Sequence, residues 1–401
     1  MLLLKITGKL EGEFVARFQQ FTSPVMAKGV EDTAFYIFNR LTSLNEVGGD
    51  SGSEGNSIER FHEYNAHMQR TFPSTLLTLS THDTKRADDV RARIAVLSEM
   101  PARWAAKLKQ WSRINVRYRR GSYPDANTEY SLYQTLIGAW PITPERLKQY
   151  MQKAMREAKR ITSWVNHHAP YEDALNGFID GILRDQAFCA EVQSFVDRIN
   201  RDGRINSLTQ TLLKCTSPGV PDLYQGGELW DHSLVDPDNR RPVDFAVRRK
   251  MLDELKGMSR EAGARHAMAN FEQGYPKLWL ILQALQVRYE RPASFDHTAT
   301  YSPIFAEGAK ADLVVAYHRS GDVIALAPRF PHRLDNNWSG TVITLPEGQW
   351  TDRMTGRRYT GGGSIRISSL LDNFPVALLV RNSDETDGRD VRRIPGRDLP
   401  A

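Results

Sequence analysis

Apolar residues recur with the period of an α-helix across residues 88–200. Triplets with the i, i+4, i+7 spacing that fills one helix face occur on both sides of Pro101. They are Val90, Ile94 and Leu97, then Trp104, Leu108 and Trp111. This pattern predicts a helical subdomain whose large aromatic side chains pack in its core.

Further helices are predicted after this stretch. Asn206 or Ser207 is a suitable N-cap for a short helix that ends at Leu213, because Pro218 and Gly219 follow. Apolar periodicity also predicts helices over 243–256 and 277–288.

Two short runs have the character of strands. Residues 75–81 are rich in Leu and Thr and lie between Pro73 and a polar segment, which predicts a buried strand. Residues 220–226 predict a strand that leads into a loop. The Gly- and Ser-rich residues 48–55 predict a surface loop.

The period of the apolar residues falls to two after about residue 300. Residues 312–318 and 323–327 flank Ser320-Gly321, which predicts a β-hairpin. Short strands at 341–345, 364–368 and 376–380 would complete a small β-sandwich. From Asn382 onward the chain is polar and basic, and we expect a flexible tail.

Composition describes an ordinary globular chain of 401 residues, 40% apolar and 25% charged. No apolar run is long enough for a membrane span, and two cysteines are too few for a disulfide framework. The net charge is +5, yet the densest basic cluster, residues 117–120, is short, so we expect no nucleic-acid partner. The first residues lack the features of an export signal, which favours the cytoplasm.

The segment Ser-Thr-His-Asp-Thr-Lys-Arg at 80–86 is the strongest candidate for chemistry. It follows a predicted strand, and the carboxyl ends of strands carry the functional groups of α/β barrels. His82 and Asp83 together are suited to bind sugar hydroxyls and to stabilise a positively charged transition state. The alternative is a turn in which Asp83 caps a helix while Lys85 and Arg86 are solvated.

Two other polar segments are weaker candidates. In residues 217–228, prolines and glycines fix an unusual backbone, and Tyr224, Gln225 and Glu228 present polar groups. Residues 236–244 place five charges in a loop bounded by prolines, for which solvated ion pairs are the simpler interpretation.

Together these segments resemble the α-amylase-type glycosidase superfamily. His82-Asp83 is similar to the last of its short motifs, and residues 218–228 are similar to its motif on the eighth barrel strand. Several flanking segments resemble one family in particular, maltooligosyltrehalose synthase, in order from about residue 14 to 380. These segments are residues 29–36, 45–50, 81–86, 133–141, 171–175 and 234–244.

The resemblance implies an isomerase that converts the reducing-end α-1,4 link of a maltooligosaccharide into the α,α-1,1 link of trehalose. It also implies a retaining mechanism with an Asp nucleophile, a Glu acid/base and a third Asp, with neither cofactor nor metal. Asp83 matches the third Asp and His82 matches a ligand of the reacting sugar. Lys85, Arg86, Tyr224, Gln225 and Glu228 match residues that line the pocket.

The sequence departs from the family pattern at its most important point, because we find neither the nucleophile motif nor the acid/base motif. The resemblance therefore implies the C-terminal half of the enzyme, with a missing N-terminal half as a further partner. We expect the isolated chain to be inactive. The alternatives are an α-glucan or maltooligosyltrehalose hydrolase of the same superfamily and a non-catalytic glucan-binding fragment.

The expected fold class is α/β with added all-α and all-β parts: the last strands of a (β/α)8 barrel, a helical insertion and a C-terminal β-sandwich. The expected divisions are a partial barrel at 1–87, the helical insertion at 88–204, barrel strand eight with its helices at 205–299, the β-sandwich at 300–381 and the tail at 382–401.

Overall fold

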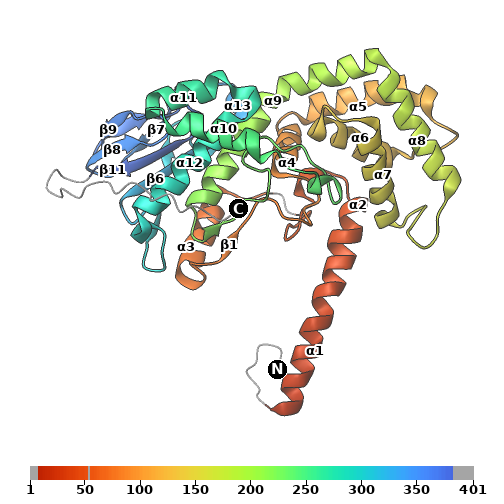
Figure 1. Cartoon of the computed structure of the whole chain (residues 1–401), viewed down its shortest axis with the longest axis horizontal. Coiled ribbons are helices and arrows are strands. Elements are labelled where there is room, and N and C mark those ends of the chain that lie inside the picture. Colours follow the sequence, from red (N-terminus) through yellow and green to blue (C-terminus); the bar gives the residue numbers. More distant parts are fainter. Residues whose placement is uncertain (1–7, 53–54, 383–401) are drawn as a thin grey trace.

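The computed structural model describes residues 8–52 and 55–382. Figure 1 shows a helical lobe, a lobe that contains most of the strands, and a long N-terminal helix that projects away from both. The predicted tail lies outside the described residues except for Asn382, which is exposed. Within the described residues, no helix is both long enough and apolar enough to cross a membrane.

The helical subdomain predicted over residues 88–200 is confirmed. Its core buries one face of every helix, with Trp111, Leu132 and Phe178 fully enclosed. Side-chain caps start several of these helices; Asp125, for example, accepts from the backbone N–H of Asn127 and Thr128. The helices are α4 (Asp88–Ala95), α5 (Pro101–Asn115), α6 (Ala126–Ala139), α7 (Pro144–Ala158), α8 (Ala169–Arg184) and α9 (Gln186–Thr216).

Helix α9 contradicts the prediction that Asn206 or Ser207 begins a new helix, because it is continuous for 31 residues. Ser207 lies inside the helix, and its hydroxyl donates to the buried carboxylate of Asp89 instead of capping a helix end. Leu208 and Leu212 are fully buried on the same helix. Tertiary packing of this second half therefore extends α9 across the division predicted at 204/205.

The N-terminal region is more helical than the sequence pattern suggested. It contains α1 (Lys9–Met26), a π-helix over Ala27–Ala34, α2 (Phe35–Ile37) and α3 (Ile58–Thr71). Of the residues in α1, Val15 is buried, while most of the other apolar side chains face solvent. The predicted 48–55 loop forms turns in its described part, and residues 53 and 54 lie outside it.

Two very short strands, β1 (Leu76–Leu77) and β2 (Val220–Pro221), pair in parallel. The prediction of a buried strand over 75–81 is wrong in length and in burial, because Leu76 is 76% exposed. Among the described residues β1 and β2 pair only with each other, so no further strand extends this sheet.

Helices predicted beyond the loops are confirmed as α10 (Phe245–Lys256) and α12 (Tyr275–Glu290). Between them lies α11 (Arg260–Ala269), which the sequence pattern did not predict. Trp279 of α12 is 1% exposed and donates to the carbonyl of Met354, so these helices pack against the strand-rich lobe.

The strand-rich lobe contains a six-stranded and a three-stranded sheet, in the orders β3-β5-β6-β11-β8-β9 and β10-β7-β4. All their pairings are antiparallel, and both sheets contribute to one hydrophobic core around Ile343, Leu326 and Trp350. The strands are β3 (Tyr301–Ile304), β4 (Ala306–Glu307), β5 (Val314–Arg319), β6 (Val323–Pro328), β7 (Val342–Thr344), β8 (Gln349–Asp352), β9 (Arg358–Thr360), β10 (Ser364–Arg366) and β11 (Ala377–Arg381).

The predicted hairpin is confirmed by β5 and β6, which pair from Val314–Pro328 to Arg319–Val323. Ser320 and Gly321 both have positive φ, 49° and 72°, as a tight hairpin turn requires. The three later predicted strands correspond to β7, β10 and β11, whereas β3, β4, β8 and β9 were not predicted.

Candidate active site

The candidate site lies where β1 and β2 end. The backbone N–H of Val220 donates to Thr75 O at 2.8 Å, and that of Asp222 donates to Leu77 O at 2.7 Å. Gly219 makes this approach possible, because a Cβ there would lie 2.7 Å from Cγ of Leu77 and its φ is 131°. The loops that follow the two strands therefore start side by side, which confirms that the first two candidate segments are neighbours.

Local hydrogen bonds shape the loop that contains His82 and Asp83. Thr84 Oγ1 accepts from the N–H of Thr81 at 2.6 Å, and Thr81 Oγ1 accepts from the N–H of Asp83 at 3.2 Å. These bonds turn the backbone so that His82 and Asp83 are both exposed. Asp83 does not cap a helix: the residue before α4 is Ala87, and no side chain caps it. The alternative interpretation, a turn in which Asp83 caps a helix, is therefore wrong.

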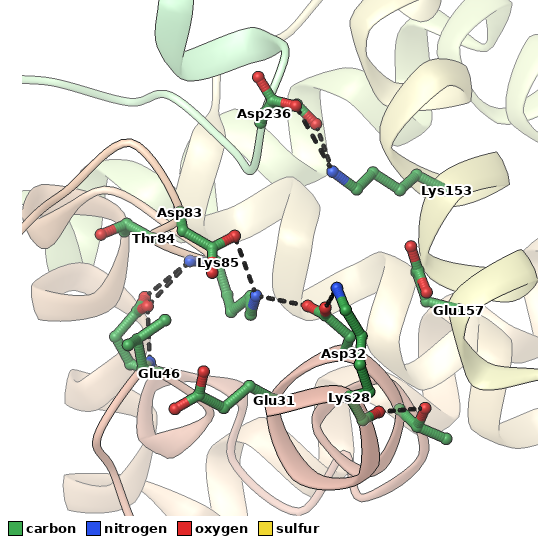
Figure 2. A network of polar contacts seen from close by, with 12 residues as sticks. Lys28, Glu31, Asp32, Glu46, Asp83, Thr84, Lys85, Lys153, Glu157 and Asp236 are labelled. Atoms are coloured by element: carbon green, nitrogen blue, oxygen red, sulfur yellow. Dashed lines mark hydrogen bonds and ion pairs between the residues drawn. The ribbon is translucent and has the colours of Figure 1, made fainter. Parts of the chain in front are cut away.

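Lys85 binds the carboxylate of Asp83 from below the surface. Its side chain is 1% exposed, and Nζ lies 3.4 Å from Asp83 Oδ1 and 2.9 Å from Asp32 Oδ1 (Figure 2). Lys28 contacts the other oxygen of Asp32. The Asp83 side chain remains 51% exposed, so a buried cation orients a carboxylate that solvent can reach.

The charges of this group are mutually stabilising. Burial alone would lower the pKa of Lys85, but its hydrogen bond and charge interaction with Asp32 leave the pKa raised. Burial would raise the pKa of Asp32, but the bonds from Lys28 and Lys85 hold that pKa below its usual value. Asp32 is consequently a carboxylate at neutral pH and has no proton to donate.

Glu46 fixes the backbone on the other side of the loop. Its buried carboxylate accepts from the N–H of Lys85 at 2.9 and 3.1 Å and from the N–H of Arg86 at 3.2 Å. Glu31 similarly accepts from the N–H of Gly48 at 3.1 Å. Asp32 and Glu46 were not among the predicted site residues, although both lie in the polar segments 29–36 and 45–50 that carried the resemblance.

Asn239 joins all three candidate segments. Its Nδ2 donates to the carbonyl of His82 at 3.0 Å and to that of Thr81 at 3.3 Å. The hydroxyl of Tyr224 donates to the carbonyl of Asn239 at 3.3 Å. A residue of the 236–244 loop therefore holds the His82 loop and the Tyr224 loop together, a role that its neighbours in sequence did not indicate.

The 236–244 loop is only partly the set of solvated ion pairs that was expected. Arg240 and Asp236 form an exposed pair. Asp238, however, accepts from Nε of Arg146 at 2.8 Å and from the N–H of Leu234 at 2.7 Å. Figure 2 shows Asp236 and Lys153 across from Asp83, with Lys153 Nζ bonded to the carbonyl of Asp236.

Three predicted lining residues are placed elsewhere. Arg86 is 1% exposed, and its guanidinium donates to Tyr150 Oη at 2.5 Å, so it is not solvated. Glu228 forms an ion pair with Arg248 at 3.1 Å, and Gln225 is exposed. Within the described part of the chain, no hydrogen bond or ion pair joins these three side chains to Asp83 or His82.

A buried ionic cluster supports both loops from behind. Lys277 Nζ of α12 lies 2.9 Å from a carboxylate oxygen of both Asp88 and Asp89 at the start of α4. Asp88 accepts from Ser80 Oγ at 3.1 Å, and Asp89 accepts from the N–H of Asp231 at 2.6 Å. Burial would lower the pKa of Lys277, yet the two carboxylates raise it.

The geometry defines what this site can do. One carboxylate is exposed and oriented, next to an exposed imidazole, which suits binding of sugar hydroxyls and stabilisation of positive charge. A retaining glycosidase also needs two carboxyl groups about 5–5.5 Å apart, one of which donates a proton. Asp32, which shares the ammonium group of Lys85 with Asp83, is held as a carboxylate by Lys85 and Lys28. Asp32 therefore does not supply that proton.

Comparisons with known proteins agree with the resemblance of the segments. No family model matches the chain. It is 41% identical over 380 residues to proteins named "Putative maltooligosyl trehalose synthase" from two Mycobacterium tuberculosis strains, CDC 1551 and H37Rv. The match covers 93% of this chain and 46% of each relative, so the chain spans about half their length.

Solved structures give the same result. The maltooligosyltrehalose synthase of Arthrobacter ramosus is 38% identical, with a TM-score of 0.82 over 91% of this chain and 46% of that one. A hypothetical maltooligosyl trehalose synthase of Sulfolobus tokodaii is 32% identical, with a TM-score of 0.72 and the same coverage. The predicted resemblance is confirmed.

Proposed function

Since this chain is similar to about half of each maltooligosyltrehalose synthase that it matches, we propose that it is the C-terminal half of such an enzyme. The complete enzyme would convert the reducing-end α-1,4 link of a maltooligosaccharide into an α,α-1,1 link by intramolecular transglucosylation, which is an isomerase activity. The observation that supports this proposal most directly is 41% identity over 93% of the chain but 46% of the relatives.

Asp83 would stabilise the transition state. An oxocarbenium-like transition state is positively charged at the anomeric carbon, whereas the bound sugar is neutral. An exposed carboxylate held by Lys85 at 3.4 Å therefore gains more interaction energy in the transition state than in the substrate complex. His82, exposed beside it, would bind hydroxyls of the same sugar.

The other predicted residues would have different roles, according to how deeply each is buried. Tyr224 would position the His82 loop through Asn239, and Lys85 would orient Asp83. Arg86 would stabilise the loop from the interior, since it is 1% exposed. Gln225 and Glu228 would contribute to the rim of the pocket only once further chain segments surround it.

The nucleophile and the acid/base would come from the missing N-terminal half. The short parallel pair β1–β2 supports this view, because Leu76 and Val220 are 76% and 45% exposed and the pair has no further strands in the described chain. These strands would be the seventh and eighth of a (β/α)8 barrel.

The remaining divisions follow from the same proposal. Residues 1–87 and 205–299 would belong to the barrel, and 88–204 would be a helical insertion between its last two strands. The shared core of the two antiparallel sheets supports a β-sandwich at 300–381. Residues 382–401 would form a tail. No cofactor or metal is required, because proton transfer and a covalent glycosyl intermediate suffice.

A reconstitution experiment tests the proposal. The chain is incubated with maltopentaose, alone and after co-expression with the half of a relative that precedes the matched region. We expect no product from the chain alone and a non-reducing, trehalose-terminated product from the pair. Product from the chain alone would refute the missing catalytic half. Release of glucose or trehalose would instead indicate a hydrolase, and binding without turnover would indicate a glucan-binding fragment.

A further inference from the structure

Arginines from distant parts of the chain meet in a cavity of about 340 Å³, away from the Asp83 site. The cavity lies between the start of α11, the end of α12 and one face of the six-stranded sheet. Its lining includes five arginines, Arg260, Arg291, Arg353, Arg358 and Arg381, together with Thr351 and Asn382. The guanidinium of Arg381 donates to the carbonyl of Glu347 and lies over the ring of Trp350, so the other four arginines carry the argument.

The fold brings these residues together by specific packing. Thr351 of β8 is paired with Arg358 of β9 on one side and with Val380 of β11 on the other. Arg358 and Thr351 therefore face the same side of the sheet. Gly356, in the turn between β8 and β9, has a φ of 77°, and a Cβ there would lie 3.3 Å from Cβ of Arg260. The turn and α11 are thus in close contact and form one wall.

The positive charge of this cavity is incompletely neutralised. Arg353 is 7% exposed and is bound by Glu290 at 2.7 and 3.0 Å, while its Nε has no hydrogen-bond partner. No ion pair or side-chain hydrogen bond of Arg260, Arg291 or Arg358 occurs within residues 8–52 and 55–382. Besides Glu290, the carboxylate that attracts Arg260 is the fully buried Asp352.

The cationic groups also disfavour one another. Burial lowers the pKa of Arg260, and the positive charge of Arg353 lowers it further. An anion in the cavity would remove this repulsion. Guanidinium groups bind phosphate oxygens through paired N–H donors, which makes arginine the preferred residue for phosphate recognition.

We propose that this cavity binds a small phosphorylated anion. A maltooligosaccharide is neutral and cannot neutralise the charge of these guanidinium groups, so we assign the cavity to an anion rather than to a glucan. Its volume admits inorganic phosphate or a sugar phosphate. The proposal does not depend on the function assigned to Asp83, because it rests only on the charges that line this cavity.

Calorimetric titration of the full chain in low-salt buffer tests this proposal, with inorganic phosphate, glucose 6-phosphate and glucose as probes. We expect binding of one or both phosphates and none of glucose. Tenfold tighter binding of glucose 6-phosphate would identify a sugar phosphate as the ligand, and equal affinities would identify the phosphate group alone. A chain ending at Asn382 is titrated in parallel, since four carboxylates follow in the sequence between 384 and 390 and can compete.

Variants locate the site. Arg260→Gln combined with Arg358→Gln should weaken phosphate binding at least tenfold. Arg366→Gln is the matched control, because Arg366 is an exposed arginine of β10 outside the cavity, and it should bind as the wild type does. The proposal is overturned by absence of binding at millimolar phosphate in both chains, or by equal weakening in Arg366→Gln.

Discussion

Asp83 presents the sharpest test at the level of a single residue. Asp83→Asn keeps the shape of the side chain but removes the charge that would stabilise the transition state. In the reconstituted enzyme we expect kcat to fall by at least about 100-fold, the scale of one lost electrostatic stabiliser, with little change in KM. Steady-state kinetics with maltopentaose measure both constants.

The control for Asp83 is the stability of the variant. The side chain is 51% exposed, so its replacement should leave urea unfolding within about 0.5 kcal/mol of the wild type. Retention of more than about a tenth of wild-type kcat would remove Asp83 from the catalytic assignment.

Glu172 should make the stability of the helical lobe depend on pH. Its carboxylate accepts from Arg156 at 2.7 and 2.9 Å and from Thr162 at 2.6 Å, and chiefly the Arg156 bond lowers its pKa to about 2. Because this pKa is depressed on folding, the stabilisation is complete above pH 4.5, the ordinary value, and is lost as the pH falls towards 2.

Urea unfolding at pH 6 and pH 3 measures this effect. The wild type should lose on the order of 1–2 kcal/mol more than Glu172→Gln between these pH values, a partly solvated ion pair being weakened by screening. Glu145→Gln, an exposed glutamate of α7, should lose as much as the wild type. Equal losses in all three proteins would contradict the prediction.

Residue types and order in the sequence made His82, Asp83 and Tyr224 candidates, because short polar segments follow apolar runs. They did not indicate the residues that hold these candidates in place. The roles of Asp32, Glu46 and Asn239 depend on contacts across 39 to 158 positions, which no local pattern encodes. The same limitation explains why Lys85 and Arg86, which a local pattern places in solvent, are buried by the fold.

At the level of secondary-structure elements, the close packing of α4 against α9 depends on Gly203. A Cβ at this position would lie 2.8 Å from Cα of Arg93 in α4, so the backbones touch. Gly203→Ala would improve helix propensity by about 1 kcal/mol but force the two helices apart. We expect a net destabilisation of about 1–3 kcal/mol in urea unfolding, typical of overpacking.

Gly257→Ala is the matched control for this substitution. The nearest atom to its Cβ would be 3.9 Å away, and its φ is −80°, so alanine fits without strain. Its stability should stay within about 0.5 kcal/mol of the wild type. A Gly203→Ala protein as stable as this control would show that α4 and α9 adjust without cost.

Strong apolar periodicity predicted the long helices and the hairpin. Elements with weak periodicity were missed where pairing or packing with distant residues determines the structure. The helical character of residues 88–200 and the β5–β6 hairpin follow from the spacing of apolar residues. Strands β8 and β9 were missed because polar residues and glycines surround them. Their structure comes from the pairing of β8 with β11 and of β9 with β8. Helix α9 was divided in the prediction because a good capping residue, Ser207, lies in its interior, where it binds Asp89.

For the whole molecule, α1 is the feature most directly connected with the proposed missing half. Five of its apolar residues recur every three or four positions on one face, and these five are strongly exposed. They are Leu10, Phe14, Phe18, Phe21 and Val25, with exposures of 78%, 48%, 41%, 66% and 53%. Figure 1 shows this helix projecting away from both lobes, so neither lobe, as far as the structure describes it, covers this face.

Burying each of these side chains in an interface would contribute about 1.5–3 kcal/mol to the free energy of association. We therefore expect a partner to occupy this face. Since the relatives are about twice as long as this chain, we expect the partner to be their preceding half. Without it, the chain should associate with itself as its concentration rises from 1 to 100 µM, as sedimentation velocity can show.

Replacing two aromatic residues of α1 tests whether self-association and binding of the preceding half both use this face. Phe18→Gln combined with Phe21→Gln should shift self-association to at least tenfold higher concentration and weaken binding of the preceding half to a similar extent, because both would use this face. Gln20→Ser, an exposed polar position of the same helix, should change neither. If the double variant bound the preceding half as tightly as the wild type does, α1 would not be part of that interface, and the reconstituted enzyme would have to assemble through the β1–β2 pair instead.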